Sequence, residues 1–179
     1  MDAIVKKSRL HGTAIVPGSK SHTIRAVLLA TMSKGISYIH NPLPSLDCKS
    51  AMHVAACFGA RTEMQPGLWT VEGVGRDLKT PDNYVDCGNS GSTAYFFASM
   101  AALTDGYTFL TGDEQIRRRP IQPVLDAINQ LGGSAVCSRP GVNACPAIIK
   151  GRMKGGTVRF HRSLSQFVSS IMMAAPLLE

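Results

Sequence analysis

Apolar residues along the chain follow two spacings, one typical of strands and one typical of helices. Short β-branched runs bounded by Gly and Asn, such as residues 36–39, predict strands. Apolar residues at helical spacing, such as Val124, Ile128 and Leu131, predict helices, and Gly132 marks the end of this one. The alternation of the two patterns predicts an α/β fold.

The pattern occurs twice and then begins a third time. Residues 13–76 and 84–151 share the order strand, helix, strand, helix and two short strands, written βαβαββ. A third unit, 156–179, has a strand at 157–160 followed by one apolar helix, and there the sequence stops. We therefore expect an N-terminal segment at 1–12, then a partial domain whose third unit is truncated.

Small hydroxylated residues gather at the same junction of each unit, where a strand gives way to the first helix. The segments read PGSKSHTIRA (17–26), CGNSGSTA (87–94) and RSLSQF (162–167). Hydroxyl groups cap helices, and the unpaired N–H groups at a helix start attract anions. Each segment alone is typical of an ordinary cap. Three at equivalent positions, one with Lys20 and Arg25, favour a shared anion site if the units pack around a common axis.

Three adjacent arginines, Arg117, Arg118 and Arg119, precede the second helix of the second complete unit. Such a run is usually a solvated basic loop. Because like charges repel one another, a bound anion would stabilise the run. We expect one of these arginines to face the shared anion site.

The charge of the chain limits the partners that it can take. There are 19 Lys and Arg against 12 Asp and Glu, a net charge of +7, which favours anionic ligands. Apart from Lys6, Lys7 and Arg9 and the arginine run at 117–119, the basic residues are scattered singly, and only 6% of the residues are aromatic, so nucleic acid is not favoured. The longest apolar stretch, 171–178, is shorter than the roughly 20 residues that span a bilayer, and residues 1–12 lack the apolar core expected of a signal peptide. We expect small anionic substrates, without nucleic acid or membrane.

Cysteine, histidine and acidic residues give little sign of further chemistry. The five cysteines and five histidines are dispersed, without a CxxC pair or a common zinc spacing. We therefore expect the cysteines to be reduced thiols in a cytoplasmic protein, and we expect no metal site. No pair of acids suggests acid–base catalysis.

Four motifs resemble, in order, those of the 5-enolpyruvylshikimate-3-phosphate synthase family: PGSKSHTIRA, GNSGST, RRRPI with a helix ending LGG, and SQFVSSIMMAAPLL. The resemblance runs from about His11 to Glu179. It implies the enolpyruvyl transferase fold, an inside-out α/β barrel of six βαβαββ units, of which about two and a half are present. It also implies a transferase of the shikimate pathway and aromatic amino acid biosynthesis. Such an enzyme moves the enolpyruvyl group of phosphoenolpyruvate to the 5-hydroxyl of shikimate 3-phosphate and releases phosphate, without a cofactor.

The resemblance further implies a partial substrate-binding domain at 13–179 and roles for individual residues. Those expected to bind shikimate 3-phosphate are Lys20, Ser21, Arg25, Ser165 and Gln166. Those expected to bind phosphoenolpyruvate are Lys20, Gly91 and Arg119, with Asn89, Ser92 and Ser163 as additional candidates. The catalytic residues are expected in the part of the family's chain that is absent here. Two positions depart from the family pattern: Leu164 replaces a usual Ser, and Tyr95 stands where an Arg is usual.

Three alternatives stay open. The chain is also similar to the sister family that acts on UDP-N-acetylglucosamine, although that family lacks the Lys-Ser and Arg pattern. A non-catalytic anion- or RNA-binding module would share the basic charge. A split enzyme would take its C-terminal half from a separate chain. We expect the 179 residues alone to be inactive, with that missing half as a candidate partner.

Overall fold

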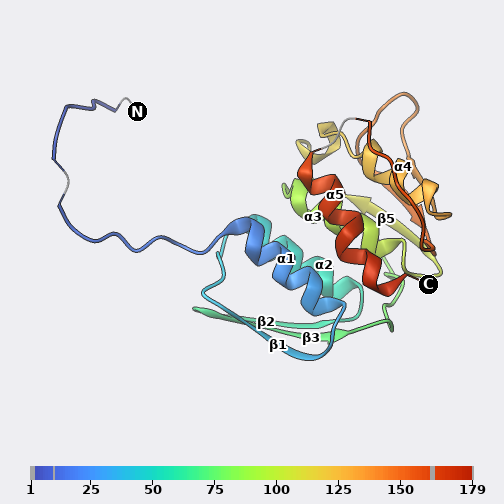
Figure 1. Cartoon of the computed structure of the whole chain (residues 1–179), viewed down its shortest axis with the longest axis horizontal. Helices are drawn as coiled ribbons and strands as arrows, with labels where there is room; N and C mark the ends of the chain where they lie inside the picture. Colours follow the sequence, from blue (N-terminus) through green and yellow to red (C-terminus); the bar gives the residue numbers. More distant parts are fainter. Residues whose placement is uncertain (1–2, 10, 162–163, 179) are drawn as a thin grey trace.

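The computed structural model describes residues 3–9, 11–161 and 164–178, and it consists of two small α/β units with a further helix packed against them (Figure 1). Figure 1 shows the N-terminal segment running away from this body. None of the helices in the described residues is long and apolar enough to cross a membrane.

The first unit is an antiparallel three-stranded sheet covered on one face by two helices. Its elements in chain order are α1 (Lys20–Thr31), β1 (Lys34–His40), α2 (Leu46–Cys57), β2 (Arg61–Gln65) and β3 (Leu68–Val74). The strand order is β1-β3-β2. Alternate residues of the strands point to opposite faces, so Trp69 and Val71 are buried under the helices while Ile36 and Tyr38 are exposed.

The second unit repeats this arrangement and adds one strand. Its elements are β4 (Val85–Asp86), α3 (Gly91–Ala101), β5 (Tyr107–Thr111), the 3₁₀ turn η1 (Ile116–Arg118), α4 (Gln122–Gln130), β6 (Ser134–Cys137) and β7 (Ala147–Lys150). The strand order is β4-β5-β7-β6, with β4 parallel to β5. The strands β5, β7 and β6 therefore match β1, β3 and β2, which agrees with the repeat expected from the sequence.

The helix α3 lies at the centre of the molecule. All of its residues are buried, as expected of a helix made of apolar and small residues without a charged side chain. The helices α1 and α5 (Ser165–Ala174) both contact it (Figure 1). The hydroxyls of Ser99 on α3 and Ser170 on α5 form a buried hydrogen bond. A 3₁₀ turn, η2 (Ala175–Leu177), follows α5.

Glycines at equivalent positions of the two units allow each sheet to lie close to the first helix of its unit. A Cβ on Gly73 would collide with the carbonyl oxygen of Ala30, and a Cβ on Gly151 would collide with that of Thr104. Only glycine permits such an approach of one backbone to another. Both contacts lie where the last strand of the unit passes the end of its first helix.

Two strands expected from the sequence are absent from the described residues. Residues 11–19 form no strand before α1, and Ile15 is 96% exposed there, because no neighbouring strand pairs with this segment. Residues 157–160 also form no strand. Instead, the side-chain amide of Gln130 accepts from the N–H of Arg159 at 3.0 Å and donates to its carbonyl at 3.4 Å. A side chain thus takes the place of the expected strand partner.

Candidate functional site

The start of α1 presents a lysine that is held by an ion pair. The hydroxyl of Ser19 caps the helix by accepting from the N–H of His22. The Nζ of Lys20 donates to Oδ2 of Asp47 at 2.8 Å, and the lysine side chain remains 51% exposed. Asp47 lies in the first turn of α2, where its charge favours the helix start. The pair joins the starts of α1 and α2.

The start of α3 is joined to the same place through buried hydroxyls. Ser90 caps the helix, and its hydroxyl lies 2.7 Å from that of Thr93. The Thr93 hydroxyl also donates to the carbonyl oxygen of Asp47 at 3.4 Å. The residue that pairs with Lys20 is therefore fixed through its backbone to α3.

The start of α5 meets the start of α3 through one side-chain hydrogen bond. The Nε2 of Gln166 donates to Oγ of Ser92 at 2.7 Å. Ser165 is exposed, and Leu164 precedes the helix without a side-chain cap and is 56% exposed. The sequence candidate Ser163 lies outside the described residues.

Arg25, on α1, also contacts α3 and α5. Its guanidinium donates to the carbonyl of Ser21 at 3.1 Å and to the hydroxyl of Ser169 on α5 at 3.5 Å. It also lies 4.8 Å from the centroid of the Phe96 ring on α3, a distance at which a cation and an aromatic face attract each other. Ser21 itself is half-buried and supplies this contact through its backbone.

The three adjacent arginines differ in what they contact. Arg117 donates to the carbonyl of Gly112, and Arg118 pairs with Glu114. The Arg119 side chain forms no hydrogen bond or ion pair with the residues that the structure describes. Its Nη1 lies 3.1 Å from the position that a Cβ on Gly91 would occupy. Arg119 alone therefore lies over the start of α3.

The contacts bring most of the sequence candidates together at one end of the helices α1, α3 and α5. Lys20, Arg25 and Arg119 supply positive charge there, and Asp47 supplies the opposing negative charge. The starts of the three helices add unpaired N–H groups and the positive ends of their dipoles. Such a surface can bind phosphate or carboxylate groups.

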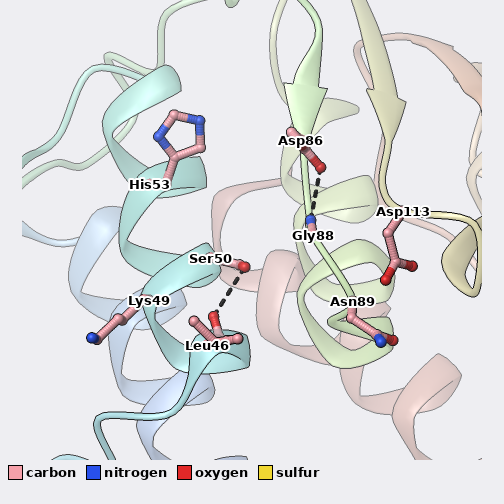
Figure 2. A pocket seen from close by; sticks show the side chains of 8 residues that line it. All are labelled: Leu46, Lys49, Ser50, His53, Asp86, Gly88, Asn89 and Asp113. Carbon is pink, nitrogen blue, oxygen red and sulfur yellow. Dashed lines mark hydrogen bonds between the residues drawn. The ribbon is translucent and has the colours of Figure 1, made fainter.

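Asn89 faces a different hollow. A pocket of about 530 Å³ lies between α2 and the loop that follows β4, and Figure 2 shows the side chains around it. The residues that line it are Leu46, Lys49, Ser50, His53, Asp86, Gly88, Asn89 and Asp113. In Figure 2 the ammonium of Lys49 points away from the opposite wall, which carries Asp86, Asn89 and Asp113. The buried Oδ1 of Asn89 has no hydrogen-bond partner among the described residues. Asn89 is thus separate from the contacts that join the helix starts.

The cysteines near the site are neutral thiols. Burial raises the pKa of Cys48, whose Sγ lies 3.7 Å from the carbonyl oxygen of Lys20. Burial also raises the pKa of Cys145 to about 12. All five cysteines are free, and the described residues contain no group of three His, Cys, Asp or Glu placed to hold a metal ion. We assign no thiolate chemistry to this surface.

Sequence reasoning missed Asp47 as part of the site. The pair cannot be found from the sequence because the partner Lys20 is 27 positions away and the pairing depends on how α2 packs against α1. One feature of the sequence could have indicated Asp47. It is a carboxylate in the first turn of the second helix, in the same unit that carries the Lys-Ser motif.

Comparisons with known proteins agree on one family. A family model described as EPSP synthase (3-phosphoshikimate 1-carboxyvinyltransferase) matches residues 4–179. The 3-phosphoshikimate 1-carboxyvinyltransferase of Ruminiclostridium cellulolyticum is 45% identical over 175 residues, which are 98% of this chain and 41% of that protein. The enzyme of the same name from Methanothermobacter thermautotrophicus is 45% identical over 182 residues, covering 100% of this chain and 43% of that protein. The chain therefore spans less than half the length of these curated relatives.

Solved structures confirm the fold class. The EPSP synthase of Acinetobacter baumannii has a TM-score of 0.86 and 24% identity, over 94% of this chain and 38% of that one. The enolpyruvyl transferase NikO of Streptomyces tendae has a TM-score of 0.59 and 14% identity, over 91% of this chain and 37% of that one. The enolpyruvyl transferase fold predicted from the sequence is thus correct.

Proposed function

The chain belongs to the EPSP synthase family, and we propose that it forms one wall of the active site of a 3-phosphoshikimate 1-carboxyvinyltransferase. The reaction transfers the enolpyruvyl group of phosphoenolpyruvate to the 5-hydroxyl of shikimate 3-phosphate and releases inorganic phosphate. This role lies in the shikimate pathway of aromatic amino acid biosynthesis. Its location is the cytoplasm, in keeping with free thiols.

One observation carries the proposal: contacts between side chains join the starts of α1, α3 and α5. Two substrates that both bear phosphate and carboxylate groups need several cations and N–H donors at one place. Lys20, Arg25 and Arg119 supply the cations, and the helix starts supply the donors. A surface of this kind binds and orients two anions.

Each substrate is assigned its own group of residues. Lys20, Ser21, Arg25, Ser165 and Gln166 bind shikimate 3-phosphate. Phosphoenolpyruvate is bound by Gly91 and Arg119 together with Lys20, which reaches both substrates. Arg119 is suited to this role because no described residue pairs with it and because its fork of donors matches a phosphate or carboxylate. The Gln166–Ser92 hydrogen bond must open or rearrange for the Gln166 amide to reach a ligand.

The chemistry needs groups that this surface does not provide. Addition of the 5-hydroxyl to phosphoenolpyruvate and the later elimination of phosphate require proton transfers. We assign no general acid or base among the described residues, and we place these groups on a facing domain that closes the site and excludes water. A C-terminal half, in the same chain or in another, is the partner that the proposal requires.

Titration of the 179-residue chain with each substrate tests the proposal. We expect chemical-shift changes in the NMR spectrum at Lys20 and Arg25 with shikimate 3-phosphate, and at Gly91 and Arg119 with phosphoenolpyruvate. Arg119→Met is expected to weaken phosphoenolpyruvate binding on the order of tenfold, since it removes a charged hydrogen-bond donor.

Lys34→Met is the matched control, because Lys34 lies in the first unit and forms an exposed ion pair with Asp77 there. An equal loss in this variant would mean that only the overall charge matters. Indifference of the wild-type chain to both substrates, with tight and strongly salt-dependent binding of an oligonucleotide, would replace the proposal with an RNA-binding module.

A further inference from the structure

Tyr95 lies beside Arg119 at the start of α3. It stands four residues after Gly91, so both residues lie on the same face of the helix. The position that a Cβ on Gly91 would occupy is 3.7 Å from Cε2 of Tyr95, 3.6 Å from Cδ of Arg119 and 3.1 Å from its Nη1. The tyrosine ring and the arginine side chain therefore share the space above Gly91.

The surroundings fix the tyrosine ring in one place. Tyr95 is 5% exposed, and its ring meets the ring of Phe167 on α5 edge to face, with centroids 4.9 Å apart. The Ser170 hydroxyl donates to the Tyr95 backbone carbonyl, which ties the same turn of α3 to α5. A ring held from two helices can serve as a rigid wall for a flexible neighbour.

The phenol is also close enough to Arg119 for the two groups to interact electrostatically. Burial raises the pKa of Tyr95, and the Arg119 guanidinium opposes this rise. Tyr95 is therefore a neutral phenol beside a cation that has no ion pair with a described residue. It can stabilise the guanidinium without cancelling its charge.

We propose that Tyr95 is a positioning residue that holds the Arg119 guanidinium over the start of α3. The ring limits where the arginine can lie, and the phenol favours the guanidinium on the side of Gly91. Arg119 is exposed and would otherwise sample many rotamers, so this restraint reduces the entropy lost when it binds an anion. The inference rests on the proposed role of Arg119 in phosphoenolpyruvate binding and adds the residue that prepares it.

Three variants of the 179-residue chain test the inference by two measurements. The first is the Nε–Hε NMR signal of Arg119 without ligand, and the second is the Kd for phosphoenolpyruvate. Tyr95→Leu should shift the Arg119 signal and raise the Kd on the order of tenfold. Tyr95→Phe, which keeps the ring, should shift the signal less and raise the Kd about threefold. Tyr107→Leu should leave the Arg119 signal in place and change the Kd by less than about twofold.

Tyr107→Leu is the matched control because it makes the same exchange at a tyrosine ring beside a different cation, Lys150, whose Nζ lies 4.9 Å from the ring centroid. If it reproduces the effect of Tyr95→Leu, or if Tyr95→Leu leaves the Arg119 signal unchanged, the inference is wrong. Should Tyr95→Leu not fold, an unchanged Arg119 signal in Tyr95→Phe overturns the inference on its own. Failure of the wild-type chain to bind phosphoenolpyruvate would refute the proposed function, while the ligand-free signal still decides the role of Tyr95.

Discussion

The two units have the same order of elements, but the starts of their first helices are held in different ways. In the second unit, β4 pairs with β5, the N–H of Cys87 donates to the carbonyl of Thr111, and the cap Ser90 is completely buried. In the first unit no strand precedes α1 in the described residues, the cap Ser19 is exposed, and an ion pair from Lys20 holds the junction. One sequence pattern therefore gives a firmly anchored helix start at α3 and a more adjustable one at α1.

The largest expected effect concerns a feature that the units share. Gly73→Ala and Gly151→Ala each force a Cβ into the backbone at the end of the first helix of the unit, and each should lower the free energy of unfolding by about 3 kcal/mol. Denaturant unfolding of the two variants measures this. Gly156→Ala is the control, because its Cβ would meet only the tip of the Leu131 side chain. A loss below about 1 kcal/mol at Gly73 alone would show that the first unit relaxes where the second does not.

The two helix caps test the difference directly. Ser90→Ala removes a buried cap and leaves the Thr93 hydroxyl with one partner fewer, so we expect a loss of about 2 kcal/mol in the free energy of unfolding. Ser19→Ala exposes its helix N–H groups to water and should cost only about 0.5 kcal/mol. Equal losses in urea titrations would contradict the contrast between the two starts.

Alkaline pH should affect the second unit more than the first. Burial raises the pKa of Cys145 to about 12, above the value of about 9 for an exposed thiol, so the folded state keeps a proton that the unfolded state loses. The stability from this group is complete below about pH 9 and falls by about 1 kcal/mol for each pH unit above it. Cys145→Ala should make the pH dependence of unfolding less steep. Cys57→Ala, at a half-buried position, should change the slope less, and the reverse order would refute the contrast.

The smallest effect on stability, and the most informative about the α1 site, is expected from Asp47→Asn. The Lys20–Asp47 pair is partly exposed, so its loss should change the free energy of unfolding by less than about 1 kcal/mol. Because the substitution removes the negative charge beside Lys20, binding of shikimate 3-phosphate should tighten about threefold at low salt. Weaker binding would mean that Asp47 orients Lys20 rather than competing with the ligand.

The order of helices and strands between residues 20 and 150 could be predicted because each element carries its own signal. Helix periodicity and glycine stops are local, and Gly59 and Gly132 indeed follow the second helices with positive φ. The two wrong strands, before α1 and at 157–160, show the limit of this approach. Their residues favour an extended backbone, but a strand also needs a partner, and the sequence does not say whether one is near.

The site could be predicted in part for the same reason. Caps and helix starts are local features, so the clusters before α1, α3 and α5 could be located from the sequence. The distinction among the three arginines depends on the turn η1, which directs Arg117 and Arg118 to local partners and leaves Arg119 over Gly91. The Lys20–Asp47 pair and the position of Tyr95 depend on helix packing, which periodicity does not reveal.

The burial of α3 has a consequence for how this protein can vary. An ordinary helix has a solvent-facing side on which substitutions are nearly neutral, but every residue of α3 is buried. A change anywhere along it either leaves a void or requires movement in a neighbouring helix that carries part of the candidate site. Directed evolution of ligand binding at the candidate site should therefore proceed through the exposed ends of α1 and α5, while variation within α3 is restricted to exchanges that conserve volume.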